Sequence, residues 1–213
     1  MRGKFVTFEG PEGSGKTSVL KAISSELQQR GNQEYILTRE PGGNRISEAI
    51  RNIILDTRLT EMDARTEALL YAAARRQHLV ESVFPALSKG KLVLCDRFVD
   101  SSVVYQGAGR GLGEQEILQM NQFATEGLIP DVTFYFDLLP EVGLTRINEH
   151  RQNEINRLDQ ESLAFHNKVH EAYLELAKEN PTRIILIDAT QTLKKVIDQT
   201  IEQLKTKLPD FFN

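Results

Sequence analysis

Hydrophobic residues along the chain form short continuous runs that alternate with longer segments in which they recur every three or four positions. The short runs are rich in β-branched and aromatic residues, and they predict strands at residues 5–8, 35–38, 92–95, 132–137 and 183–188. The longer segments have helical spacing and predict helices at residues 16–30, 46–55, 66–88, 114–126, 140–151, 158–180 and 192–207.

This alternation predicts an α/β protein with three αβα layers. Strands that are separated by helices make right-handed crossovers, so we expect a central parallel sheet of about five strands covered by helices on both faces. The run Leu92–Cys95 is apolar throughout, as expected for a strand buried on both sides. No repeat or linker divides the chain, so we expect a single domain over residues 1–213.

A phosphate-binding motif follows the first predicted strand and opens the first helix. Its pattern is G-x-x-x-x-G-K-[ST], and its glycines let backbone N–H groups point at a phosphate. Lys16 would reach the β- and γ-phosphates, and the Thr17 hydroxyl would ligate Mg²⁺. The motif predicts ATP binding by Gly10, Pro11, Glu12, Gly13, Ser14, Gly15, Lys16 and Thr17.

Two other classes of P-loop protein fit the sequence poorly. GTPases read guanine with Asn-Lys-x-Asp, and the nearest match, Asn167–His170, lacks the aspartate and lies within a predicted helix. A chain of 213 residues leaves little room for a motor or a transporter. Small P-loop kinases are therefore the leading class, with the corresponding three-layer fold.

Composition and charge indicate the compartment of the protein and the kinds of partner that it does not bind. The net charge is −4, which does not favour nucleic acid, and no apolar run approaches the roughly 18–20 residues that would cross a membrane. The single cysteine, Cys95, cannot form an intrachain disulfide, which suits a reducing compartment. The N-terminus leads straight into a strand-like run instead of a signal peptide, so we expect a cytoplasmic protein that binds neither nucleic acid nor membrane.

Together with the phosphate loop, five further stretches give the sequence a family resemblance. They are Thr38–Gly43, Tyr71–Arg76, Asp96–Ser102, Tyr105–Gly107 and Asn156–Asp159. In this order and spacing, from about Phe5 to Asp188, they resemble bacterial thymidylate kinase. The resemblance implies transfer of the γ-phosphoryl group of ATP to dTMP with Mg²⁺, a step in dTTP biosynthesis, by a homodimer. Apolar helix faces within residues 66–87 and 114–123 could form the dimer interface.

The predicted acceptor-phosphate site lies at the end of the third strand. Asp96 and Arg97 emerge there at the ligand edge of the sheet, and an arginine offers a planar fork for a monophosphate. The resemblance implies that Arg97 grips the phosphate of dTMP and that Asp96 lies near Mg²⁺ and its waters. It also implies that Arg51 helps to hold the same phosphate.

Base and sugar recognition are assigned through the same resemblance. Tyr71 matches a position that is usually phenylalanine and stacks on thymine, and Arg75, on the same helix face, matches a donor to a thymine carbonyl. Ser102 and Gln106 match the groups at the remaining base edge. For the sugar, Glu12 matches a contact to the 3′-hydroxyl, Tyr105 lies under the ring and favours deoxyribose, and Glu40 shapes the pocket through its neighbours.

The phosphate loop carries no arginine, so the charge that stabilises phosphoryl transfer must come from elsewhere. A polar segment at about residues 146–158 interrupts two helical patterns, as a lid would. We expect Arg151 to supply this charge and Arg157 to hold the closed lid, with these two roles exchangeable and Arg146 as a third candidate.

Two alternatives stay open. The chain could be a nucleotide kinase that acts on a different monophosphate, or a regulatory protein that binds ATP without transferring phosphate.

Overall fold

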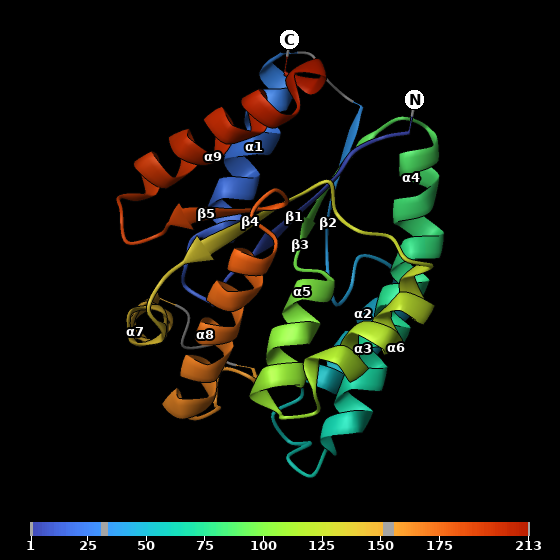
Figure 1. Cartoon of the computed structure of the whole chain (residues 1–213), viewed down its shortest axis with the longest axis vertical. Helices are drawn as coiled ribbons and strands as arrows, with labels where there is room; N and C mark the ends of the chain where they lie inside the picture. The colour runs from blue at the N-terminus through green and yellow to red at the C-terminus, as the bar shows by residue number, and fades with distance from the viewer. Residues whose placement is uncertain (1, 31–33, 151–155, 213) are drawn as a thin grey trace.

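The structure is a computed structural model, and it describes residues 2–30, 34–150 and 156–212. A five-stranded, fully parallel sheet runs through its centre in the order β2-β3-β1-β4-β5 (Figure 1). The strands are β1 (Phe5–Glu9), β2 (Tyr35–Arg39), β3 (Leu92–Asp96), β4 (Val132–Asp137) and β5 (Ile184–Asp188). The predicted parallel α/β fold is confirmed.

Helices cover both faces of this sheet. One face packs against α1 (Lys16–Gln29) and α9 (Leu193–Lys207), which lie side by side in Figure 1. The other face packs against α4 (Phe84–Ser88), α8 (Leu163–Glu179) and two π-helical segments, η1 (Leu79–Val83) and η2 (Val103–Gly109). The remaining helices are α2 (Arg45–Leu55), α3 (Ala64–His78), α5 (Val99–Ser102), α6 (Glu114–Thr125), α7 (Pro140–His150) and the short η4 (Pro209–Phe211).

The alternation of side chains along β1 shows how the sheet separates two cores. Val6 and Phe8 point into the core beneath α1 and α9, where Phe8 stacks on Phe134 with ring centroids 5.6 Å apart. Phe5 points to the opposite side and meets Phe98 edge-on at 4.9 Å. Burying such a side chain contributes about 1.5–3 kcal/mol to the free energy of folding, so the central strands form a rigid base for the loops at their ends.

Three segments differ from the helices that the sequence predicts. The predicted helix at 66–88 begins earlier, at Ala64, because the Asp63 carboxylate caps its first turn, and it widens into η1 just before Pro85, which has no N–H for the α-helical ladder. The helix expected from residue 158 begins at Leu163, where Ser162 caps it. Helical structure at residues 99–109 was not predicted.

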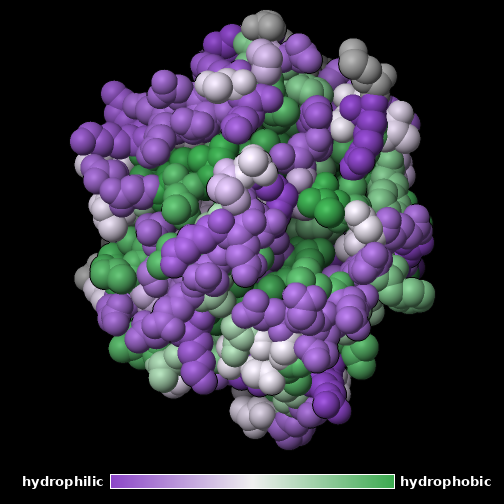
Figure 2. Space-filling model, viewed as in Figure 1, coloured by the Kyte–Doolittle hydropathy of each residue, from purple (hydrophilic) through white to green (hydrophobic). Residues whose placement is uncertain are grey.

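Within the described ranges, no helix is both long and apolar enough to cross a membrane. The face in Figure 2 is mostly hydrophilic, with hydrophobic atoms showing in patches between the polar side chains.

Candidate active site

A cavity of about 810 Å³ opens beyond the carboxyl ends of the central strands. It is lined by Thr17 and Asp96, both predicted to lie near Mg²⁺, and by all nine residues predicted to bind the acceptor nucleotide. These nine are Glu12, Glu40, Arg51, Tyr71, Arg75, Arg97, Ser102, Tyr105 and Gln106. The fold therefore brings together stretches that are up to 94 residues apart in the sequence, counted from Glu12 to Gln106.

The phosphate loop wraps tightly around the ammonium group of Lys16. Its Nζ donates to the carbonyl oxygens of Gly10 at 2.9 Å and of Pro11 at 2.8 Å, and the side chain is almost fully buried. Burial lowers the pKa of this ammonium, and the positive charge of Arg97 lowers it further. Gly13 has φ +76°, and a Cβ there would come within 2.7 Å of the Gly143 carbonyl, so the loop needs glycine at this position.

Asp96, the last residue of β3, has the chemistry of a cation site. Its Oδ1 is buried and has no hydrogen-bond partner in the described part of the chain, and the side chain lines the same cavity as Thr17. Mg²⁺ prefers carboxylate and hydroxyl oxygens and keeps several waters, so this donor set fits the ion.

Arg97 directly follows β3 and contacts the phosphate loop. Its backbone N–H donates to the Phe8 carbonyl at 3.0 Å, which ties it to the end of β1. Its guanidinium donates to Glu12 Oε1 at 2.7 Å and to Ser101 Oγ at 3.2 Å, and it lies over the Tyr105 ring. The backbone of Arg97 has φ +69°, which is costly for a residue with a Cβ and must be held by its surroundings.

The carboxylate of Glu9 supplies much of that support. It is fully buried and accepts hydrogen bonds from the Phe98 N–H at 2.8 Å, the Ser101 hydroxyl at 2.5 Å and the Tyr173 hydroxyl at 2.8 Å. Burial, and then the nearby carboxylate of Asp100, raise the pKa of Glu9 from its ordinary value of 4.5 to about 7. Glu9 thus fixes the segment that directly follows Arg97.

Arg51 approaches the cavity from α2. Its guanidinium donates to the Pro41 carbonyl at 2.9 Å, and its pKa is lowered by burial and then by the charge of Arg39. Arg39 itself pairs with Glu48 at 3.0 Å. Arg51 therefore keeps a positive charge at the cavity wall, where a phosphate would neutralise it.

Arg75 is the most completely paired cation of the site. Only 2% of its surface is exposed, and its Nε donates to Glu40 Oε2 at 2.7 Å. The remaining four N–H groups donate to Ser102 Oγ, the Phe98 carbonyl and Asn121 Oδ1. A base carbonyl would have to share an N–H donor with one of these partners. The Ser102 hydroxyl accepts from two guanidinium nitrogens, so it can most easily give up one of these hydrogen bonds.

Three neighbouring side chains shape the rest of the predicted base and sugar pocket. Burial raises the pKa of the Tyr71 phenol, so this aromatic side chain stays neutral. Tyr105 meets Tyr173 edge-on at 6.4 Å beside the Arg97 guanidinium. Gln106 donates through Nε2 to the buried Glu67 at 2.9 Å, which fixes its amide.

Two of the three predicted lid arginines lie within the described residues, and they lie at different places. Arg157 is buried, pairs with Glu67 and donates to the Ile54 carbonyl at 3.0 Å. Arg146 donates to the Gly13 carbonyl of the phosphate loop at 3.1 Å. Arg151 lies outside the described residues, as do its neighbours 152–155.

Glu9, Glu67, His78, Asn121 and Tyr173 contribute to the site although the sequence did not single them out. One signal was available: Glu9 is a charged residue that ends an otherwise apolar strand. The others lie on helices whose neighbours across the fold are set only by tertiary packing.

A phosphate loop on one strand, with an arginine fork at the end of the adjacent strand, defines a P-loop kinase that handles two phosphorylated ligands. Comparison with known proteins narrows this class. The sequence model of the family described as thymidylate kinase matches residues 8–201. The chain belongs to the thymidylate kinase family, and it is an enzyme, a phosphotransferase.

Individual relatives agree with this assignment. The chain is 63% identical to the thymidylate kinase of Ligilactobacillus salivarius, with 96% of this chain and 98% of the relative covered. It is 62% identical to that of Latilactobacillus sakei, with 95% and 94% covered. Among solved structures, the thymidylate kinase of Ehrlichia chaffeensis is similar with a TM-score of 0.77 and 31% identity, over 96% of this chain and 99% of the other.

The buried carboxyl of Glu9 generates a prediction for stability against pH. Because its pKa is higher in the folded protein, the folded state holds this proton more tightly than the unfolded chain. The corresponding stability is complete below pH 4.5 and is lost as the pH rises through about 7. Each pKa unit corresponds to about 1.4 kcal/mol, so the total loss is about 3 kcal/mol.

Urea denaturation of the wild type and of Glu9→Gln at pH values from 4.5 to 8 measures this effect, since glutamine does not titrate. We expect the wild type to lose stability relative to the variant by roughly 2–3 kcal/mol across the range. A constant difference between the two proteins would show that Glu9 does not titrate there.

Proposed function

We propose that this chain transfers the γ-phosphoryl group of ATP to dTMP, giving ADP and dTDP, and so supplies dTTP synthesis in the cytoplasm. The observation that carries the proposal is the 2.7 Å contact between Glu12 of the phosphate loop and the Arg97 guanidinium. A loop that binds the donor phosphates thus directly touches the arginine proposed to bind the acceptor. The donor and acceptor phosphates would then lie next to each other, so that one phosphoryl group could pass directly between them.

The residues divide the work of positioning and of charge neutralisation. Lys16 would contact the transferred group from the donor side, and Arg97 with Arg51 would hold the dTMP phosphate from the acceptor side. No general base is required, because the attacking phosphate oxygen is already ionised. Thr17, and Asp96 through water, would hold Mg²⁺, which neutralises charge on the donor phosphates when it is bound.

We assign recognition of the nucleoside to a second group of residues that line the cavity. Tyr71 would stack on the thymine ring, and Arg75, Ser102 and Gln106 would meet its polar edges. Glu12 would accept from the 3′-hydroxyl, which explains a carboxylate within a loop that binds anionic phosphates. Tyr105 would lie under the sugar and disfavour a 2′-hydroxyl, with Glu40 acting through Arg75.

A lid at about residues 146–158 of the single domain would complete the site. Arg157 is suited to anchoring it, because its guanidinium is held by Glu67 and by the end of α2. We assign the transition-state charge to Arg151. Arg146, whose guanidinium contacts the phosphate loop, would support the loop.

The homodimer belongs to the same proposal. On α3 and α6, which pack against each other, Leu69 and Phe123 leave 60% and 90% of their surfaces exposed. An apolar surface on this pair of helices would suit the contact between two chains. Sedimentation analysis should give the mass of two chains, and the mass of one chain would exclude this assembly.

A panel of nucleoside monophosphates tests the proposed reaction. ADP release in a coupled assay should be fast with dTMP and detectable but poor with dUMP, because a missing methyl group typically costs about 10–200-fold in specificity. Faster turnover of another monophosphate would identify the alternative kinase. ATP binding without turnover of any monophosphate would identify the regulatory protein.

The lid assignment predicts different losses for its arginines. Arg151→Ala should lower kcat by about 10³-fold or more, as expected when the charge on a moving phosphoryl group is removed. Arg157→Ala should lower kcat less and raise the KM for ATP. Arg30→Ala, at the far end of α1, is the matched control and should leave both constants unchanged. Near-normal kcat in both the Arg151 and Arg157 variants would exclude the assignment.

A further inference from the structure

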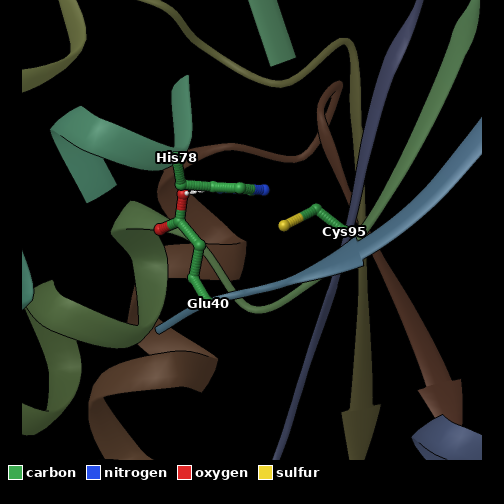
Figure 3. A group of neighbouring side chains, drawn as sticks. All are labelled: Glu40, His78 and Cys95. Atoms are coloured by element: carbon green, nitrogen blue, oxygen red, sulfur yellow. Dashed lines mark hydrogen bonds and ion pairs between the residues drawn. The ribbon is translucent and has the colours of Figure 1, made fainter. Parts of the chain in front are cut away.

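Beneath the predicted base pocket, three buried side chains with metal-ligand chemistry lie close together. Glu40, His78 and Cys95 place their ligand atoms within 4.8 Å of one another (Figure 3). All three are engaged within the protein: both Glu40 oxygens and both His78 ring nitrogens have partners, and the Cys95 thiol donates to the Arg97 carbonyl. Burial also raises the pKa of Cys95 well above its ordinary value, which disfavours a metal-binding thiolate.

The same contacts form a continuous hydrogen-bonded chain instead. Thr38 Oγ1 lies 2.7 Å from His78 Nε2, and His78 Nδ1 lies 2.8 Å from Glu40 Oε1. The other oxygen, Glu40 Oε2, accepts from Arg75 Nε at 2.7 Å. Because an ionised carboxylate can only accept, the His78 proton is on Nδ1 when the ring is neutral, and Thr38 then donates to Nε2.

Burial makes this series of hydrogen bonds rigid. His78, Glu40 and Arg75 are exposed by at most 3%, so no water competes for their hydrogen bonds. The loop after β2 closes over the imidazole: a Cβ on Gly43 would lie 2.6 Å from Thr38 Oγ1 and 2.8 Å from His78 Cδ2. In such a dry environment, each partner has only one arrangement that satisfies its polar atoms.

The position of Arg75 depends on this series of hydrogen bonds. Glu40 is its one anionic partner among the described residues, and the other acceptors are a hydroxyl, an amide and a backbone carbonyl. Glu40 in turn lies immediately after β2 and is oriented by His78, the last residue of α3. The chain therefore joins the last turn of α3 to the sheet through one carboxylate.

We propose that His78 is a positioning residue for base selection. Through Glu40 it fixes the plane of the Arg75 guanidinium, so that the pocket presents only N–H donors to the ring carbonyl at position 4 of thymine. The inference rests on the proposed function. A cytosine base carries an amino group at that position, and two facing donors repel, so a rigid Arg75 would reject dCMP while a loosened one would not.

The test compares His78→Leu, His78→Asn and Thr38→Val by steady-state kinetics with dTMP and dCMP. Asparagine keeps a donor near Nδ1, whereas leucine removes both ring nitrogens at similar volume. Leu79→Ala is the matched control, because Leu79 is fully buried one residue further along and its apolar side chain has no group that could join these hydrogen bonds. Thermal denaturation of every variant establishes that it is folded.

We expect His78→Leu to raise the KM for dTMP and to lower the dTMP/dCMP ratio of kcat/KM by at least about tenfold, as for one weakened charged hydrogen bond. The KM for ATP and kcat for dTMP should stay within about twofold, since the donor loop is untouched. His78→Asn should restore most of the ratio. Thr38→Val should lower the ratio in the wild-type background and have no further effect beside His78→Leu.

An unchanged ratio in a folded His78→Leu variant overturns the inference, and so does a loss that Leu79→Ala reproduces. If His78→Leu does not fold, Thr38→Val decides: a lowered ratio supports the inference and an unchanged one overturns it. Absence of dTMP turnover in the wild type would instead mean that the proposed function itself is wrong.

Discussion

The parallel pairing of β1 with β3, secured at its end by Glu9, is the constraint on which the site depends. Phe8 pairs with Asp96 in this register, so the phosphate loop after β1 begins beside the Asp96–Arg97 turn after β3. Glu9 then crosses between the two strands, because its carboxylate accepts from the Phe98 N–H and the Ser101 hydroxyl. Without that contact, the positive φ of Arg97 would lose a buried, hydrogen-bonded support at its carboxyl side.

A second constraint is the disposition of charge in the cavity. Arginines enter it from several elements, and each is held by a carboxylate or a carbonyl: Arg97 by Glu12, Arg75 by Glu40 and Arg51 by Pro41. Removing one partner of a buried charge pair costs about 3–5 kcal/mol, so the Arg75–Glu40 pair is fixed before any substrate binds. Arg97 and Arg51 are the less buried of the three, and they are the two assigned to a phosphate, which can replace their present partners.

The sequence predicted the sheet, the phosphate loop and the family, because each of these is encoded locally. A strand is recognised as an apolar run. The loop Gly10–Thr17 is recognised as a phosphate-binding motif because it follows a predicted strand and opens a helix. The pairing of residues across the fold was not readable in this way. Glu67 gathers Gln106, Arg110 and Arg157 only because α3, η2 and the segment after residue 155 pack together, and nothing in the local pattern of α3 marks that glutamate.

Helix boundaries were predicted where the interior of a segment was periodic and missed where a cap or a proline decided the end. Asp63 and Ser162 each start a helix through a side-chain hydrogen bond, and Pro85 follows the widened turn in η1. The helical segment at 99–109 was missed because its residues pack into two separate cores, so no single apolar stripe marks it. These differences shift segments without changing which residues reach the cavity.

The central claim is that donor and acceptor phosphates have separate sites that touch at Glu12 and Arg97. Calorimetric titration of dTMP, without ATP, into the wild type, Lys16→Ala and Arg97→Ala tests it most directly. The account predicts a Kd for Lys16→Ala within about threefold of the wild type, and a Kd at least about tenfold weaker for Arg97→Ala, the usual loss for a hydrogen bond between charged groups. A comparable loss of dTMP affinity in both variants would contradict the separation of the two sites.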